Sequence, residues 1–219
     1  MNIGIAISTH DRRDIADHSI AEWRRFLPVG AKLVIVDDSS VIPYPGADYR
    51  FEQQAGISIV KNKCLELLDD CDHVFCMDDD IFPSVNSWWL PYVHSNLQHA
   101  CYIFDRKMLW KEPDYIAYDL PRGCLLYFHK RCIQVAGGFD TNFKLWGYEH
   151  AELSRRIFNM NLTPARYIDI PNSKGLFYSH DEQSTSKSSL DVVERNRFIR
   201  SNKKYFDETF LSNQFIPYK

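Results

Sequence analysis

The amino-acid sequence predicts a single α/β domain whose central sheet is mostly parallel and flanked by helices. Two observations carry this prediction. A strand, a helix and a second strand follow one another at the start of the chain, and two apolar runs end in consecutive aspartates. The length of 219 residues allows one such domain with a sizeable core, and 45% hydrophobic with 25% charged residues is typical of globular proteins.

The first strand and helix are predicted from two kinds of periodicity. Residues 2–8 ("NIGIAIS") form a short β-type run, and residues 14–26 carry apolar side chains at helical spacing. Residues 32–38 ("KLVIVDD") are nearly all apolar before the aspartates, as in strands buried on both faces of a parallel sheet. Residues 39–55 are rich in Pro, Gly and Tyr and predict a loop.

The next helix and strand lead into a run of three aspartates. Residues 57–70 show an apolar helical stripe, and residues 73–77 ("HVFCM") predict a third strand. In open α/β sheets ligands bind outside the carboxyl ends of the strands, so a site is expected where this strand ends. Pro83 and Ser84 favour a helix start, and we predict a helix from there to Leu97.

The second half of the chain is less regular. Strands are predicted over residues 101–104, 124–129 and 165–170. A short helix over 130–139 is stopped by two glycines, and residues 149–160 predict an amphipathic helix. A further helix with many basic residues is expected near the end of the chain.

Composition excludes some classes of function. The formal net charge of −3 gives no overall attraction to nucleic acid or anionic membranes. No stretch approaches the roughly 18 uninterrupted apolar residues of a membrane span, and the N-terminus shows no basic leader. The six cysteines form no CxxC pair, which is typical of free buried thiols in a reducing compartment. We therefore expect a soluble, cytoplasmic protein.

The acidic triplet Asp78, Asp79 and Asp80 is the strongest chemical signal. Adjacent like charges repel and desolvate badly unless a cation compensates them. Strand alternation would send Asp78 and Asp80 to one side and Asp79 to the other. Two converging carboxylates suit Mg²⁺ or Mn²⁺, whereas an acidic turn before a helix is the purely structural alternative.

A second acidic pair, Asp37 and Asp38, ends another predicted strand and is followed by two serines. Carboxylates there can accept hydrogen bonds from a nucleoside base or from ribose hydroxyls. The same Asp-Asp-Ser sequence is also favourable turn chemistry. Its position relative to the triplet makes the nucleoside interpretation the stronger one.

Five segments in this order resemble the family 2 glycosyltransferases and their relatives with the GT-A fold. The segments are "ISTHDRRD", "VIVDDSS", "GISIVKNKCLELL", "FCMDDDIFP" and "GGFDTNFKLWGYEHAELSRRI". The fourth is similar to the Asp-x-Asp motif, and the last to the Trp-Gly-x-Glu motif of polypeptide N-acetylgalactosaminyltransferases and galactosyltransferases. The resemblance covers residues 3–180. It implies a Rossmann-like GT-A sheet and transfer of a sugar from a nucleotide sugar, a UDP-sugar, to a hydroxyl group.

The resemblance also divides the chain. Residues 1–189 would form the GT-A domain, with a nucleoside-binding half over about 1–83 and an acceptor-side half over about 84–189. Residues 190–219 would form a C-terminal helical extension. The polar segment 180–189 is expected to be a loop that closes over the bound donor and excludes water.

The resemblance implies a metal site at the triplet. Asp78 and Asp80 match the ends of the Asp-x-Asp motif and would bind a divalent cation, Mn²⁺ or Mg²⁺, together with the donor diphosphate. Asp79 would assist donor binding at most. His180, which follows an apolar run, would complete the metal shell, as a late histidine does in many relatives.

The donor nucleoside would lie beside this metal site. Asp37 and Asp38 match the base- and ribose-binding pair, with Thr9 on the opposite wall of the pocket. Arg12 could reach a phosphate, although a solvated surface arginine is an equally common case. Lys61 could neutralise the donor diphosphate.

The acceptor side is expected in "WGYEH". Trp146 offers an apolar face to a sugar or base, and Gly147 lets the backbone approach closely. Inverting relatives carry an aspartate as base where this chain has His150. Three alternatives remain open: His150 is the base, Glu149 takes that role, or the enzyme retains configuration and needs no side-chain base. We favour Glu149 facing the acceptor and donor sugar, with His150 second.

The acceptor itself is not specified by the sequence. A saccharide is favoured, and a modified nucleic-acid base is the other candidate. Two other functions compete with glycosyl transfer. One is a Mg²⁺-dependent nucleotidyltransferase, although no GxxxxGK[ST] phosphate loop is present. The other is a module that binds a nucleotide sugar without turnover.

Overall fold

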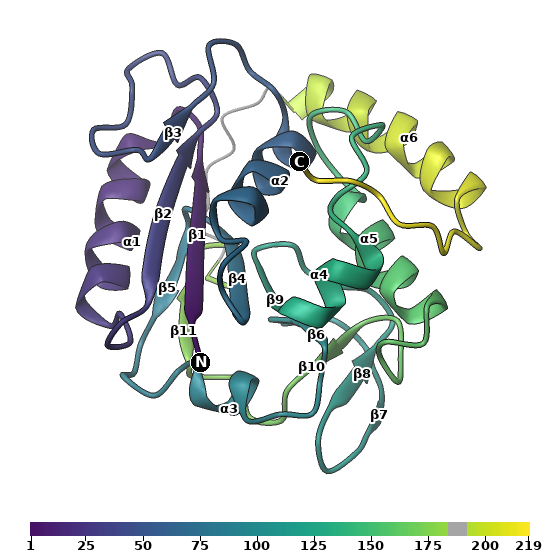
Figure 1. The fold of residues 1–219 in the computed structure, drawn as a ribbon. Helices are drawn as coiled ribbons and strands as arrows, with labels where there is room; N and C mark the ends of the chain where they lie inside the picture. The colour runs from purple at the N-terminus through teal and green to yellow at the C-terminus, as the bar shows by residue number, and fades with distance from the viewer. Residues whose placement is uncertain (184–191) are drawn as a thin grey trace.

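A computed structural model describes residues 1–183 and 192–219. Its centre is a six-stranded mixed sheet in the order β3-β2-β1-β4-β9-β6 (Figure 1). The predicted opening is present as β1 (Ile3–Thr9), α1 (Arg13–Arg25) and β2 (Lys32–Asp37). The third predicted strand is β4 (His73–Asp78), which pairs parallel with β1 on the side away from β2. The α/β class with a mostly parallel sheet is therefore confirmed.

The remaining strands of this sheet complete its two edges. The two-residue strand β3 (Tyr49–Arg50) extends the parallel part beyond β2. Strand β9 (Leu125–His129) pairs antiparallel with both β4 and β6 (His99–Cys101). Both were predicted, although β6 begins two residues before the predicted range and ends earlier.

Strand β1 separates two hydrophobic clusters, because successive side chains of a strand point to opposite faces of the sheet. Ile5 packs in the cluster that contains Trp23 of α1. Ala6 packs in the cluster that contains Val60 of α2 (Ile57–Leu67). The two helices therefore cover opposite faces of the sheet.

Helices α4 (Lys130–Ala136) and α5 (Glu149–Asn159) lie on the same face as α2, and all three contribute buried residues to one cluster (Figure 1). Both helices were predicted from the sequence. Helix α4 stops at Gly137, whose φ of 77° is a value that residues with a side chain rarely adopt.

Two small sheets were not predicted as sheets, although β10 (Ile168–Asp169) lies within the strand predicted over residues 165–170. One is antiparallel and contains β7 (Met108–Lys111), β8 (Ile116–Tyr118) and β10 (Ile168–Asp169). The other pairs β5 (Ile81–Pro83), which directly follows the acidic triplet, with β11 (Phe177–Ser179). This second pairing brings a late segment of the chain beside the triplet.

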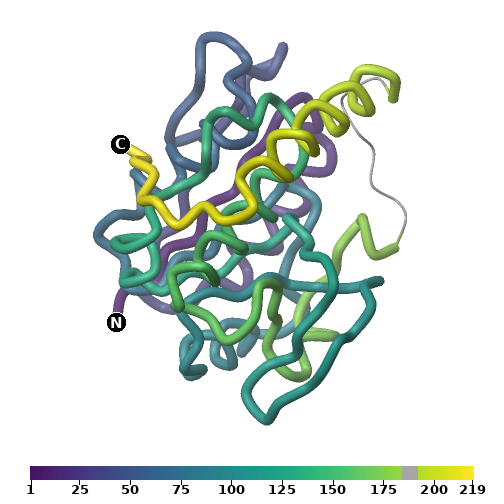
Figure 2. The backbone as a smooth tube through the Cα atoms, turned by 90° about the vertical axis from the view of Figure 1, so that its right-hand side faces the viewer, coloured from purple at the N-terminus to yellow at the C-terminus, as the bar shows by residue number. Residues whose placement is uncertain are grey.

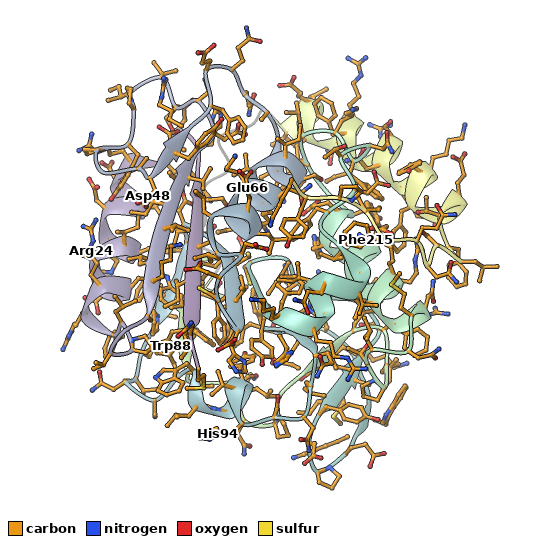
Figure 3. The ribbon with its side chains drawn as sticks, viewed as in Figure 1. Arg24, Asp48, Glu66, Trp88, His94 and Phe215 are labelled. Carbon is orange, nitrogen blue, oxygen red and sulfur yellow. The ribbon has the colours of Figure 1, made fainter. Side chains whose placement is uncertain are left out.

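The helix predicted over residues 83–97 is wrong over most of its length, and its first residue is the last of a strand. Pro83 ends β5, and the Ser84 N–H donates a hydrogen bond of 2.8 Å to the carbonyl of the residue before β11. Of these described residues, only α3 (Leu90–Val93) is α-helical. Trp88, labelled in Figure 3, is fully buried and packs edge-on against an α1 tryptophan.

The C-terminal helix α6 (Val192–Glu208) begins where the description resumes after residues 184–191. Most of the predicted loop and the first residues of the predicted terminal helix therefore lie outside the described residues. Beyond α6 the tail turns back across the molecule (Figure 2), and the Gly138 N–H donates to the Ile216 carbonyl at 2.8 Å. The C-terminal extension is thus packed onto the main body.

All six cysteines are buried and free, as the sequence predicted. Among the helices of the described ranges, none is long and apolar enough to cross a membrane.

Candidate active site

A cavity of about 230 Å³ lies at the carboxyl ends of β1, β2 and β4, where the sequence placed a site. It is bounded by the ends of these strands on one side and by the start of α5 on another. Eight of the predicted site residues line it: Thr9, Arg12, Asp38, Asp78, Trp146, Gly147, Glu149 and His150. Five others do not: Asp37, Lys61, Asp79, Asp80 and His180.

The pair Asp37 and Asp38 organises the backbone around the cavity. Asp37 is fully buried, and its carboxylate accepts hydrogen bonds from two backbone N–H groups of the following loop, at 2.8 and 2.9 Å. Asp38 lines the cavity and accepts from the N–H groups of Ala55 and Gly56, at 2.6 and 3.1 Å. Both carboxylates therefore perform the turn chemistry that the sequence left open, and only Asp38 borders the cavity.

The three aspartates of the acidic triplet do not divide as strand alternation predicted, with Asp78 and Asp80 on one side. Strand β4 ends at Asp78 and the chain turns at the next two residues, so strand alternation does not extend over the triplet. The Arg12 guanidinium forms ion pairs with both Asp79 and Asp80, the latter at 2.9 Å. Asp79 also accepts a hydrogen bond of 2.6 Å from the Thr9 hydroxyl. Asp79 and Asp80 thus share one cation, and Asp78 stands apart.

Asp79 is the most enclosed member of the triplet, with no exposed surface. Burial raises the pKa of Asp79 to about 7, although Arg12 and the Thr9 hydroxyl act in the opposite direction. Thr9 therefore contributes to the site by holding Asp79 as well as by lining the cavity.

Asp78 has its own cation. The Lys61 Nζ lies 3.1 Å from Asp78 Oδ1 and donates a hydrogen bond of 2.9 Å to the Gly123 carbonyl. Burial would lower the pKa of Lys61, but the carboxylates of Asp78 and Glu149 outweigh it and raise that pKa. Lys61 is 1% exposed, so its positive charge acts on the cavity through the ion pair with Asp78.

The start of α5 places a hydrogen-bonded pair, Glu149 and His150, against the cavity. Tyr148 precedes the helix with a left-handed φ of 72°, and the Glu149 carboxylate lies 3.0 Å from His150 Nδ1. Burial would raise the pKa of Glu149, but His150 and Lys61 outweigh it and lower that pKa to about 2. The His150 ring packs on Gly123, where a Cβ would come within 2.8 Å of Nδ1.

Helix α6 supports the segment before α5. The side-chain amide of Asn202 donates to the carbonyls of Lys144, Trp146 and Gly147, at 2.8, 2.8 and 3.1 Å. The Arg195 guanidinium lies 4.5 Å from the centre of the Trp146 ring and covers one of its faces. The C-terminal extension therefore forms part of the cavity wall.

Solved structures share this arrangement of strands and helices. A mannosyltransferase from Pyrobaculum calidifontis, solved with GDP-mannose and Mn²⁺, matches 93% of this chain and 69% of its own with a TM-score of 0.57 and 11% identity. S. aureus TarS matches 91% of this chain and 69% of its own, with a TM-score of 0.58 and 11% identity. GalNAc-T7, solved with UDP, GalNAc and Mn²⁺, matches all of this chain and 52% of its own, with a TM-score of 0.60 and 14% identity. The chain has a GT-A fold.

Sequence comparison adds nothing to this likeness, since no family model and no curated protein matches the chain. The GT-A fold therefore rests on the arrangement of its elements. It confirms the fold that the five short motifs predicted and leaves the roles of individual residues as predictions.

The residues of this GT-A fold offer a divalent cation oxygen ligands. Asp78 and Asp181 both line the cavity, and Asp80 follows Asp78 by two residues in the same turn. Such hard oxygen donors fit Mg²⁺ or Mn²⁺. The His180 N–H donates to the Asp80 carbonyl at 2.9 Å, which brings the predicted histidine to the same place. Within residues 1–183 and 192–219, however, no three His, Cys, Asp or Glu side chains are already clustered around a metal position.

Some residues of the cavity were missed at the level of sequence. Asp181 borders it beside the predicted His180, and Arg106 and Arg122 enter it from loops before β7 and β9. These three residues belong to no motif, so only the fold reveals them. Arg195 carried a weak signal, as one of the basic residues of the terminal helix.

Proposed function

We propose that the protein is a glycosyltransferase that moves a sugar from a nucleotide sugar, a UDP-sugar, to a hydroxyl group of an acceptor. The observation that carries the proposal is a single cavity of a GT-A fold that contains Asp38, Asp78 and the Glu149–His150 pair. The nucleotides and nucleotide sugar bound by two of the similar structures support a donor of this kind.

We assign a divalent cation, Mn²⁺ or Mg²⁺, to Asp78 and Asp80, with His180 and Asp181 beside them. When bound, the cation supplies positive charge that stabilises the leaving nucleoside diphosphate. The Mn²⁺ of two similar structures supports this assignment. Arg12, held by Asp79 and Asp80, borders the cavity and offers the same diphosphate a second positive charge. Lys61, which is buried, fixes the position of Asp78 through their ion pair.

We assign proton removal to His150, which reverses the order favoured by the sequence. Glu149, with a pKa of about 2, is a weak base at neutral pH, whereas a general base works best with a pKa near the operating pH. Its carboxylate instead holds His150 Nδ1 and leaves Nε2 for the acceptor hydroxyl. His150 takes the hydroxyl proton as the acceptor oxygen bonds to the anomeric carbon. The electron pair of the broken bond leaves with the nucleoside diphosphate.

Release of nucleoside diphosphate tests this function. The protein is incubated with Mn²⁺ and a panel of UDP- and GDP-sugars, and both nucleoside diphosphate and pyrophosphate are measured. A glycosyltransferase releases the diphosphate, a nucleotidyltransferase releases pyrophosphate, and a binding module releases neither. Asp80→Ala should abolish release, whereas Asp114→Ala, at an exposed loop position, should not. Unchanged turnover of Asp80→Ala would remove the metal assignment.

We also propose a cytoplasmic location. Its support is the set of six buried, free thiols, a pattern that a reducing compartment maintains.

A further inference from the structure

Three arginines line the cavity without a carboxylate partner. They are Arg106, Arg122 and Arg195, and we name them the arginine cluster. Within the described parts of the chain, none of the three forms an ion pair, whereas Arg12 in the same cavity is paired with Asp79 and Asp80. The cluster therefore brings to the cavity three guanidinium groups that no carboxylate pairs with directly.

This arrangement is unfavourable without an anion. All three arginines are partly buried, and the Arg106 Nε is inaccessible to solvent with no hydrogen-bond partner among the described residues. Burial and the nearby charge of Arg122 both lower the pKa of Arg106, while Asp105 and Asp119 oppose this without forming an ion pair. Partly desolvated like charges destabilise a folded protein unless a counter-charge is bound.

Aromatic rings hold two of the guanidinium groups in place. Arg122 lies 4.4 Å from the centre of the Phe104 ring, and Arg195 lies 4.5 Å from the centre of the Trp146 ring. Stacking of this kind engages the flat face of a guanidinium and leaves N–H donors at its edge for a ligand. The cluster is therefore positioned before any ligand binds.

Two members of the cluster lie beside the residues that we assign to the acceptor side. Arg122 directly precedes Gly123, on which the His150 ring packs, and Arg195 covers Trp146. Thr9 and Asp38, by contrast, stand at the ends of β1 and β2. An anion held by the cluster would therefore lie next to the group that we assign to proton removal, where an acceptor binds.

We infer that the acceptor carries a phosphate group and that the arginine cluster binds it. The inference rests on the proposed glycosyl transfer and specifies its acceptor. Guanidinium groups donate in a planar fork that matches phosphate oxygens, and several of them around one site favour phosphate over an uncharged sugar. A phosphorylated sugar and a nucleic-acid strand both supply this chemistry.

Binding at a filled donor site tests the inference. The protein is saturated with UDP and Mn²⁺ and titrated calorimetrically with glucose 6-phosphate, with a short oligothymidylate and with glucose. We expect a phosphate-bearing probe to bind and glucose to bind at least tenfold more weakly. In the double variant Arg106→Gln/Arg122→Gln, affinity for that probe should fall at least tenfold. Arg24→Gln, an exposed change on α1 far from the cavity (Figure 3), should leave it unchanged.

The outcomes separate the two sources of phosphate. A loss confined to glucose 6-phosphate indicates a small phosphorylated acceptor. A loss confined to oligothymidylate, with weaker dependence of its affinity on salt, indicates a nucleic-acid strand. The inference is overturned if neither probe binds the UDP-saturated protein, or if the double variant binds them as the wild type does.

UDP binding by the same variants keeps the test independent of folding and of the proposed function. If the double variant binds UDP as the wild type does, a loss of probe binding cannot reflect misfolding. If the wild-type protein binds neither UDP nor GDP, the proposed function fails before the acceptor is addressed. Arg195→Gln provides a further check, because it removes the guanidinium that covers the Trp146 ring and should weaken the same probe several-fold.

Discussion

At the level of single residues, the three aspartates of the acidic triplet are each paired with a cationic side chain. Arg12 is 15% exposed and serves two carboxylates, Asp79 and Asp80, whereas Lys61 serves Asp78. The sequence left Arg12 open between a phosphate contact and a solvated surface position. The structure adds a third role, since this arginine already neutralises most of the acidic turn. A ligand that binds there meets a site whose charge is partly balanced.

Replacing Arg12 should therefore destabilise the protein. Arg12→Gln leaves Asp79 and Asp80 buried without their cation, and breaking a buried ion pair costs about 3 kcal/mol or more. Urea denaturation measures the loss. The neighbouring change Arg13→Gln breaks an exposed ion pair with Asp17 and a contact with the Tyr44 ring at 5.9 Å, and should cost less than about 1 kcal/mol. Mn²⁺ should raise the melting temperature of Arg12→Gln more than that of the wild type, and equal increases would show that the cation does not bind at these aspartates.

The Glu149–His150 pair gives a second prediction at this scale. His150→Gln should lower kcat by about 10²–10⁴-fold, the usual contribution of a general base, with little change in UDP affinity. Glu149→Gln keeps a partner for His150 Nδ1 and should lower kcat less. Steady-state kinetics on both variants decide the order. A larger loss for Glu149→Gln would return the base to the residue that the sequence favoured.

At the level of elements, long and uniform runs were predictable and short pairings were not. Strands β1, β2 and β4 and helices α2 and α5 follow from apolar periodicity that extends over six or more residues. Strands β5 and β11 contain three residues each, too few for a periodic signal. Their pairing depends on two segments almost a hundred residues apart, and it also explains the wrong helix over 83–97.

The same limit applies to the site. The sequence predicted the positions of the acidic pair and the acidic triplet because each follows a recognisable strand. The ion pairs of Arg12 with Asp79 and Asp80 were not predicted, since Arg12 lies 67 and 68 positions away from them in the chain. Arg106 and Arg122 stand in loops without any motif. Which side chains converge is fixed by the tertiary fold, and local pattern carries no information about it.

Strand β6 supplies a prediction about pH. His99 is buried against Tyr127 of β9 and Ser154 of α5, and burial lowers its pKa from 6.5 to about 4, although its hydrogen bond to the Tyr127 carbonyl acts in the opposite direction. The unfolded chain therefore binds a proton more readily than the folded one between these two pH values. The stability that His99 contributes is complete above about pH 6.5 and is lost as the pH falls towards 4.

The loss should reach about 3 kcal/mol, at about 1.4 kcal/mol for each unit of pKa. Urea denaturation at pH 7 and pH 4.5 measures it in the wild type and in His99→Gln, which has no proton to gain in this range. The variant should show a smaller decrease in the free energy of unfolding between the two pH values. Parallel decreases in both proteins would show that other groups account for the acid sensitivity.

At the level of the whole molecule, the C-terminal extension is structurally inseparable from the cavity. The division at residue 190 treated it as an appendage, yet α6 contributes Arg195 to the cavity wall. Asn202 is the one buried residue among those described in α6. Its amide serves three carbonyls of residues 144–147, and its oxygen accepts a hydrogen bond from the Lys144 N–H at 3.2 Å. The extension therefore fixes the segment that carries Trp146 and Gly147.

Asn202→Ala should consequently reduce both stability and turnover. It leaves several buried backbone groups without partners, at a cost of about 1–3 kcal/mol. It also releases Trp146 and Gly147 immediately before the Glu149–His150 pair, so the KM for the acceptor should rise. The affinity for UDP, which we assign to the ends of β1 and β2, should stay near that of the wild type. Asn196→Ala, an exposed change on the same helix, controls for helix propensity: it should raise stability by no more than about 0.7 kcal/mol and leave the acceptor KM unchanged. If Asn202→Ala lost stability but kept the acceptor KM, the extension would support the fold alone and the cavity wall would not depend on its position.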